Sequence, residues 1–300
     1  MRYEGTVYRP PSEAGSLIIQ ATLACPHNRC GFCAMYKDRS FRVRPHQEVV
    51  EDLDLAVQTY GPHGVRTIFL ADGNSAVLSA RRLVAIGEAA RERFPSLERI
   101  TLYGSAQYLV KKTRQEWRRF DGAGVTRIHS GLESGDAVTL ADIDKGVTPE
   151  EAVAAYRHVK DAGIELSVYL MVGVAGTERW QQHALGSAEV LSAAPPHFVR
   201  LRTFTPSPGT PWHQRWLDGL LTLPSPYEAL AEIRLLIENL HGPTQLLSDH
   251  MLNFMDLHGR LPGQKGRLLE QIDDALESVS YTHLRAHETK TRISFCVFGL

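Results

Sequence analysis

Three of the four cysteines in this 300-residue chain lie within nine positions, at Cys25, Cys30 and Cys33. Their C-x4-C-x2-C spacing places three thiols on one short segment. Thiolates at close, fixed spacings hold iron–sulfur clusters, and three thiolates for four irons leave one iron open to another ligand. The same segment is compatible with a zinc site in which His27 or His258 is the fourth ligand. The spacing therefore predicts a metal centre and leaves both metals open, and the remaining alternative is three unrelated buried cysteines.

The apolar run 16–23 leads directly into the first cysteine and has the length and β-branched content of a buried strand. Similar runs recur along the chain, separated by segments whose apolar residues have helical spacing. The predicted strands are residues 16–23, 67–71, 99–103, 125–129, 165–172 and 198–204. Strands that alternate with helices indicate parallel βαβ units, whose functional residues gather at the carboxyl ends of the strands. The pattern predicts an α/β fold, either a partial barrel or an open sheet.

Capping residues and glycines mark the ends of the intervening helices. Three helices are expected to begin where a Ser or Thr precedes a Glu by three residues, at Thr113, Thr148 and Ser225. The predicted helices are residues 45–60, a segment that ends near 94, residues 113–122 and 148–163, one after the glycines at 173–176, residues 225–240, and one from about 264.

The cysteine segment resembles that of radical S-adenosylmethionine (radical SAM) enzymes. The usual family signature is C-x3-C-x2-C with an aromatic residue before the last cysteine. Phe32 fills the aromatic position, but the first gap is one residue longer here. The variant Cys-x-His-Asn-x-Cys-x-Phe-Cys-x-Met-Tyr resembles a branch without an assigned substrate, related to coproporphyrinogen-oxidase-like and methylthiotransferase-like proteins. The resemblance implies a partial (β/α)6 TIM-like barrel and a [4Fe–4S] cluster on the three cysteines.

The resemblance also implies contacts to S-adenosylmethionine at the ends of successive strands. They involve Phe32, Ala71, Asp72, Ser130, Glu133, Lys145, Gly173 and Gly176. Where the family has a Gly-Gly-Glu-like turn for the amino group, this chain has Ala71-Asp72-Gly73-Asn74, which is also ordinary turn chemistry. Glu133 occupies the place of a ribose contact. Twelve residues later Lys145 replaces the usual arginine at the methionine carboxylate, and Gly173 and Gly176 match a glycine-rich adenine contact.

The implied reaction begins with reductive cleavage of S-adenosylmethionine by the cluster, which gives a 5′-deoxyadenosyl radical that abstracts hydrogen from the substrate. No further catalytic residue is assigned. The expected partners are a small-molecule or peptide substrate and a one-electron donor such as flavodoxin or ferredoxin. The alternative is a zinc-stabilised α/β binding module without catalysis.

Composition supports a globular chain in a reducing compartment. Hydrophobic residues make up 43% and charged residues 22% of the chain, which is enough for a sizeable core. The net charge of −1 predicts no general affinity for nucleic acid. No run approaches the ~20 apolar residues of a membrane span. Residues 1–5 lack the apolar core of a signal peptide, and clustered thiols are typical of the cytoplasm, so we expect a cytoplasmic protein without membrane contact.

Four segments are predicted: an N-terminal extension, residues 1–15; the core, 16–243; a small helical C-terminal appendage, 244–278; and residues 279–300, which resemble translated sequencing-adapter read-through and are expected to be non-native. Cys296 lies in that last segment and is not proposed as a ligand. A basic segment that contains Arg42 and Arg44 follows the cysteines. It is expected either to be solvated or to bind an anionic part of a substrate.

Overall fold

The computed structural model describes residues 1–278, except for the side chains of Asp121 and Ser278. Its main sheet has the strand order β1-β4-β5-β6-β7-β8-β9-β10. The strands are β1 (Leu17–Gln20), β4 (Thr67–Ala71), β5 (Arg99–Tyr103), β6 (Val125–Glu133), β7 (Glu165–Val172), β8 (Phe198–Thr203), β9 (Thr244–Leu247) and β10 (His258–Leu261). The β1–β4, β4–β5, β5–β6 and β8–β9 pairs are parallel, and only β10 is described as antiparallel to its neighbour. The predicted α/β class is confirmed.

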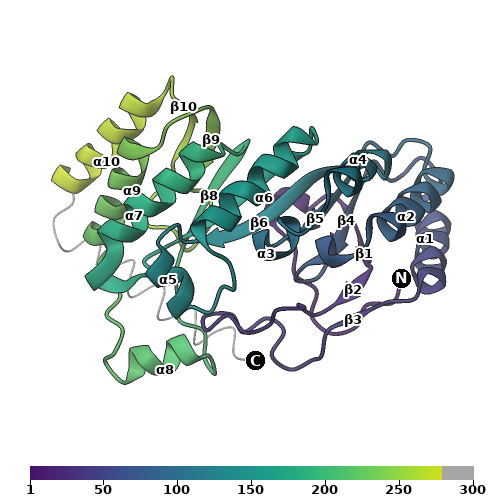
Figure 1. The fold of residues 1–300 in the computed structure, drawn as a ribbon, viewed down its shortest axis with the longest axis horizontal. Helices are drawn as coiled ribbons and strands as arrows, with labels where there is room; N and C mark the ends of the chain where they lie inside the picture. Colours follow the sequence, from purple (N-terminus) through teal and green to yellow (C-terminus); the bar gives the residue numbers. More distant parts are fainter. Residues whose placement is uncertain (279–300) are drawn as a thin grey trace. The chain divides into compact units, whose positions relative to one another are not determined.

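The chain divides into two compact units, the first of residues 1–132 and 144–168 and the second of residues 133–143 and 169 onward. In the first unit, α1 packs against α2, α2 against α4, and α3 against α6 (Figure 1). These helices are α1 (His46–Tyr60), α2 (Ala80–Arg93), α3 (Ala106–Leu109), α4 (Arg114–Gly122) and α6 (Pro149–Asp161), and two short 3₁₀ turns are η1 (Pro11–Glu13) and η2 (Ser75–Val77). In α1 the buried residues Val49, Leu53 and Ala56 recur at helical spacing, so one stripe faces the core.

The predicted first strand is wrong in its extent. β1 ends at Gln20, and β2 (Thr22–Leu23) pairs with β3 (Arg42–Val43) in a separate two-stranded antiparallel sheet. Arg44 supplies the reason, because its backbone N–H donates to the carbonyl of Ala21 at 3.1 Å and its guanidinium to that of Gln20 at 2.8 Å. Those carbonyls therefore satisfy their hydrogen bonds away from the main sheet.

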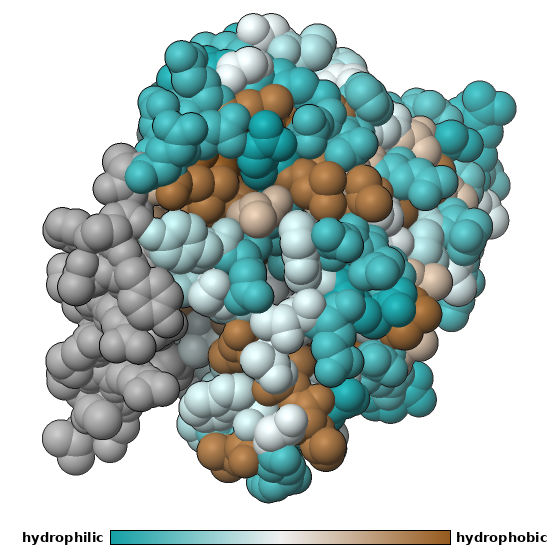
Figure 2. All heavy atoms as spheres, turned by 90° about the vertical axis from the view of Figure 1, so that its left-hand side faces the viewer, coloured by the Kyte–Doolittle hydropathy of each residue, from teal (hydrophilic) through white to brown (hydrophobic). Residues whose placement is uncertain are grey.

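In the second unit, α9 lies between α7 and α10 (Figure 1). Its helices are α5 (Ala137–Asp142), α7 (Gly176–Ala193), α8 (Pro211–Leu217), α9 (Pro226–Asn239) and α10 (Lys265–Ser278). Residues 244–278 are not only helical, since they contribute β9 and β10, each too short to show a strand period. Figure 2 views this unit from the side of α10 and shows both hydrophilic and hydrophobic groups on that face. Leu217, the last residue of α8, and Leu220, shortly after it, are exposed.

The capping predictions at Thr148 and Ser225 are confirmed, since both helices begin with reciprocal capping boxes. Thr113 and Glu116 form the same pair of contacts at the start of α4. The segment 279–300, with Cys296, lies outside the described residues. Within residues 1–278, no helix combines the length and hydropathy that a membrane span needs.

Candidate active site

Asp72, directly after β4, fastens the start of the cysteine loop, which we define as residues 24–33. Its Oδ2 accepts a hydrogen bond from the N–H of Ala24 at 2.8 Å, and the N–H of Gly73 donates to the carbonyl of Ala24 at 3.2 Å. A Cβ at residue 73 would lie 2.6 Å from the Cβ of Cys25, so the close approach requires glycine. Ala24, directly before the first cysteine, thus both donates a hydrogen bond to the turn after β4 and accepts one from it.

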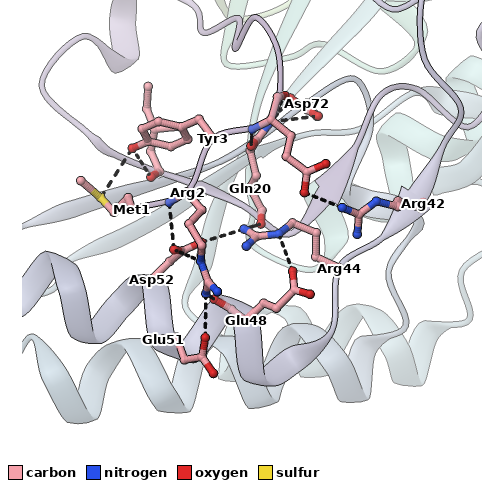
Figure 3. Close-up of polar contacts among 12 residues, drawn as sticks. Met1, Arg2, Tyr3, Gln20, Arg42, Arg44, Glu48, Glu51, Asp52 and Asp72 are labelled. Atoms are coloured by element: carbon pink, nitrogen blue, oxygen red, sulfur yellow. Dashed lines mark hydrogen bonds and ion pairs between the residues drawn. The ribbon is translucent and has the colours of Figure 1, made fainter.

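The carboxylate of Asp72 is fully buried and occupied within the protein. Besides Ala24, it accepts hydrogen bonds from Nε2 of Gln20 at 3.2 and 3.3 Å (Figure 3). Burial raises the pKa of Asp72, and the hydrogen bonds from Gln20 and Ala24 oppose that rise. This carboxylate therefore acts on the cysteine loop, and its predicted contact with the S-adenosylmethionine ammonium stays a prediction.

Arginines of the basic segment form ion pairs with other residues of the first unit. Arg44 is buried and pairs with the buried carboxylate of Asp52 at 2.7 Å, and Arg42 pairs with Glu4 (Figure 3). Both alternatives considered for this segment fail at Arg44, which is neither solvated nor available to a substrate. Its guanidinium also donates to the carbonyl of Gln20, 24 positions away, a contact that no local sequence pattern indicates.

The rest of the cysteine loop is held by backbone and amide contacts. Asn28 has φ 45° and donates from Nδ2 to the carbonyl of Tyr36 at 2.7 Å, and the N–H of Cys33 donates to the carbonyl of Cys30 at 3.2 Å. All three cysteines are half-buried. Burial raises the pKa of Cys33, while the backbone N–H of Met35 and the charge of Lys145 oppose the rise. A bound metal would have to supply the remaining stabilisation of a thiolate.

Three buried polar atoms suit a bound group beside this loop. Nδ2 of Asn74, Oγ of Ser105 and Oδ1 of Asn28 have no hydrogen-bond partner among the described residues. Asn74 follows β4 and accepts from the Ser105 N–H at 3.3 Å, so two of the three atoms lie at neighbouring strand ends. Buried polar atoms are normally satisfied. Nδ2 of Asn74 and Oγ of Ser105 can donate to an anionic cluster or its ligand, whereas Oδ1 of Asn28 can only accept, as it would from an ammonium group.

Within residues 1–278, no three His, Cys, Asp or Glu side chains are arranged around one metal position. The ligand roles of Cys25, Cys30 and Cys33 therefore stay predictions, and cluster binding requires their side chains to converge.

Two predicted cofactor contacts are fully buried in the first unit. The carbonyl of Ala71 accepts from Oγ of Ser75 at 2.8 Å, and Oγ of Ser130 lies 3.2 Å from the hydroxyl of Tyr156. Tyr156 is a partner that the sequence did not suggest. Both residues already have protein partners, and their contacts with a cofactor stay predictions.

Phe32 and Lys145 come together in the first unit. Nζ of Lys145 lies 5.6 Å from the centre of the Phe32 ring, and the lysine is only 8% exposed. A charge at this distance from an aromatic face gains cation–π attraction. The structure thus places the predicted carboxylate-binding cation beside the residue that precedes Cys33.

The remaining predicted contacts belong to the second unit. Glu133 ends β6 with φ 68° and is half-buried. Gly173 and Gly176 follow β7, with φ 83° and 66°. Gly173 lines a cavity of about 730 Å³ at the carboxyl ends of β7 and β8, together with Thr203, Phe204 and residues of α8. The glycine turn is therefore beside a volume that accepts a small molecule.

A buried chain of polar side chains, which the sequence analysis missed, supports this turn. Nδ1 of His183 lies 2.8 Å from Oγ of Ser134, and Nε2 lies 3.3 Å from Oε1 of Glu232. The same Oε1 accepts the N–H of Gly173 at 2.9 Å. These hydrogen bonds connect the loop after β6, helices α7 and α9, and the turn after β7.

One face of α7 holds the loop after β6 along its length. Arg179 pairs with Asp136 at 2.9 Å, His183 contacts Ser134, and Oγ of Ser187 accepts from the N–H of Gly135 at 2.9 Å. The spacing of 179, 183 and 187 along a helix is a signal that could have indicated a shared polar face, although not its partner.

Comparison with protein-family models identifies the family of the segment that contains these residues. The family model described as "Radical SAM superfamily" matches residues 19–185, more than half of the chain. This chain belongs to the radical SAM superfamily. The match contains every predicted site residue, from the cysteine loop to the glycine turn.

One curated relative is "4'-phospho-dehydrooxetanocin synthase" from Priestia megaterium, 26% identical over 169 residues. The alignment covers 51% of this chain and 23% of that protein. The chain thus spans about a quarter of the relative's length.

Solved structures confirm the radical SAM TIM-like fold. Coproporphyrinogen III oxidase (HemN) from Escherichia coli has a TM-score of 0.56 at 17% identity, covering 74% of this chain and 51% of that one. The methyltransferase TsrM from Kitasatospora setae has a TM-score of 0.55 at 18% identity, covering 70% and 41%. Methylornithine synthase (PylB) has a TM-score of 0.52 at 19% identity, covering 75% and 63%.

Proposed function

We propose that this chain is a radical SAM enzyme that holds a [4Fe–4S] cluster through Cys25, Cys30 and Cys33. When bound, the cluster supplies one electron for reductive cleavage of S-adenosylmethionine to methionine and a 5′-deoxyadenosyl radical, which abstracts hydrogen from the substrate. The observation that carries the proposal is the three-cysteine loop inside the family-matched region, which Asp72 fastens to the end of β4 and Asn28 fastens to the carbonyl of Tyr36.

The chain's own residues bind and orient in this proposal. Asn74 and Ser105 offer buried polar atoms beside the strand ends, and Lys145 offers a positive charge to the methionine carboxylate. Gly173 lets the backbone approach a flat ring closely. Cofactor chemistry makes the radical, while the protein supplies ligation, orientation and exclusion of water.

A small-molecule or peptide substrate and a one-electron donor such as flavodoxin or ferredoxin complete the proposal. The cavity of about 730 Å³ in the second unit supports a small-molecule substrate because it falls within the usual range for such sites. A reducing cytoplasm is the compartment that suits free cluster thiolates.

The decisive experiment compares anaerobically reconstituted wild type with single Ala variants of Cys25, Cys30 and Cys33. Wild type should be brown, contain iron and sulfide, and form 5′-deoxyadenosine with a reductant. Each variant should lose both the cluster and cleavage, because each removes one thiolate. Cys296→Ala is the control and should behave as wild type.

Two results would contradict the proposal. A colourless wild type that carries zinc would support the binding-module alternative, and loss of the cluster in Cys296→Ala would invalidate the three-ligand assignment.

A further inference from the structure

The cysteine loop makes a second attachment through His27, which lies in its lengthened first gap. Nε2 of His27 lies 2.6 Å from the backbone carbonyl of Asp144, and the imidazole is only 6% exposed. A carbonyl oxygen only accepts, so Nε2 carries the proton and donates. Both residues belong to the first unit, and this contact joins positions 117 residues apart.

The turn that His27 contacts has a backbone that needs support. Asp144 has φ 47°, a left-handed conformation that is uncommon for residues other than glycine, although Asp adopts it more readily than most. Gly146 has φ 71°, and a Cβ there would lie 2.7 Å from Cε1 of His27. The imidazole therefore rests directly on the turn, and such strained turns persist where their surroundings determine them.

Lys145 is the residue between these two turn positions. Its Nζ lies over the ring of Phe32, a residue of the cysteine loop, at 5.6 Å from the ring centre. The loop and the turn thus contact each other through His27 on the backbone and through Phe32 on the lysine, in addition to the exposed pair of Arg29 with Asp144. Moving the turn would move the charge relative to Cys33, whose pKa that charge affects.

We propose that His27 is a positioning residue that fixes the turn 144–146 and so holds Lys145 in place for the carboxylate of S-adenosylmethionine. The proposal rests on the proposed function for its ligand. The proposal gives a role to the longer first gap, residues 26–29. His27 contacts the turn 144–146, and Asn28 holds the loop to the carbonyl of Tyr36.

The first test requires no cofactor. Lysines are acylated slowly in the intact apo protein and the modified sites are quantified by mass spectrometry. His27→Ala should raise the rate at Lys145 about tenfold, because the turn no longer buries it. Lys112, which is half-buried and bonded to the carbonyl of Leu78, serves as an internal reference and should not change.

Arg29→Ala is the matched control. Arg29 lies in the same loop and also faces Asp144, at 3.4 Å, but it is 68% exposed, so its removal should leave Lys145 unchanged. His27→Gln retains an N–H donor and should restore part of the protection. Equal rates at Lys145 in His27→Ala and wild type, or a parallel rise at Lys112, would overturn the proposal.

The second test measures S-adenosylmethionine affinity after anaerobic reconstitution. His27→Ala should bind about tenfold more weakly with unchanged iron content, and should cause no further loss in a Lys145→Met background. The same loss in both backgrounds, or unchanged affinity in His27→Ala, would overturn the assigned role. A wild type without cluster or binding would refute the proposed function instead, and the acylation result would still decide whether His27 holds the turn.

Discussion

Lys145 is a cation that the fold keeps largely out of water, beside Phe32 and the cysteine loop. Lys145→Met keeps most of the apolar stem and removes only the charge. We expect S-adenosylmethionine to bind about ten- to a hundredfold more weakly, because one charge-assisted contact is lost. Anaerobic titration with parallel iron and sulfide analysis measures this, and cluster content should not change.

Lys145→Arg is the control, since it keeps the charge and should retain most affinity. Wild-type affinity in both Lys145→Met and Glu133→Ala would refute the cofactor contacts assigned around β6.

The spacing of the cysteines singled them out as candidate metal ligands, and the resemblance to radical SAM motifs singled out Phe32 and Lys145 as candidate cofactor contacts. The partners of these residues were not predictable in the same way. Asp72 bonds Ala24 across 48 positions, and His27 reaches Asp144 across 117. Such contacts depend on which elements become neighbours, and no local pattern encodes that.

Among elements, the bond from Gly173 to Glu232 gives α9 a direct role in holding the turn after β7. Glu232→Ala would leave the Gly173 N–H and the imidazole of His183 without a buried acceptor. We expect the free energy of unfolding to fall by about 2–4 kcal/mol, measured by urea denaturation. Glu232→Gln should lose less, because its amide oxygen still accepts from Gly173.

Glu238→Ala on the same helix is the matched control, because Glu238 is half-exposed and pairs only at the surface with Arg234. It should change stability by less than about 1 kcal/mol. Equal losses in Glu232→Ala and Glu238→Ala would show that the buried chain contributes nothing specific.

Periodicity predicted elements well where burial was uniform along the segment. β4, β5 and β7 have the predicted bounds, since each is rich in apolar and β-branched residues and is bounded by turn residues. It failed for β1 and β2, where an apolar run is divided by the hydrogen bonds of Arg44. It also missed β9 and β10, whose four residues each are too few for a period to emerge.

At the scale of the whole molecule, the N-terminal extension takes part in the core of the first unit. Glu13 is fully buried, with Oε1 3.2 Å from Nε2 of His129 and Oε2 2.6 Å from Oγ of Ser16. Burial by itself would raise the pKa of Glu13, but hydrogen bonds from His129 and Ser16 and the charge of Arg99 outweigh it. The pKa is therefore lowered from its ordinary 4.5.

A lowered carboxyl pKa makes stability depend on acid. The contribution of ionised Glu13 is fully present above its ordinary pKa and is lost as the pH falls through the lower pKa of the folded state. Melting temperatures measured from pH 7 to pH 3 should fall less steeply below about 4.5 in Glu13→Gln than in wild type. Parallel curves for the two proteins would show that Glu13 does not contribute to acid sensitivity.

The buried hydrogen bonds that link Ser134, His183, Glu232 and Gly173 also affect the thermodynamics of binding. These hydrogen bonds are buried, so a broken bond is not replaced by a hydrogen bond to water. They link the loop after β6 to the turn after β7. The conformational entropy of both segments is therefore lost when the unit folds. A ligand that contacts either segment meets a preorganised backbone, and its affinity is not reduced by the entropy of ordering it.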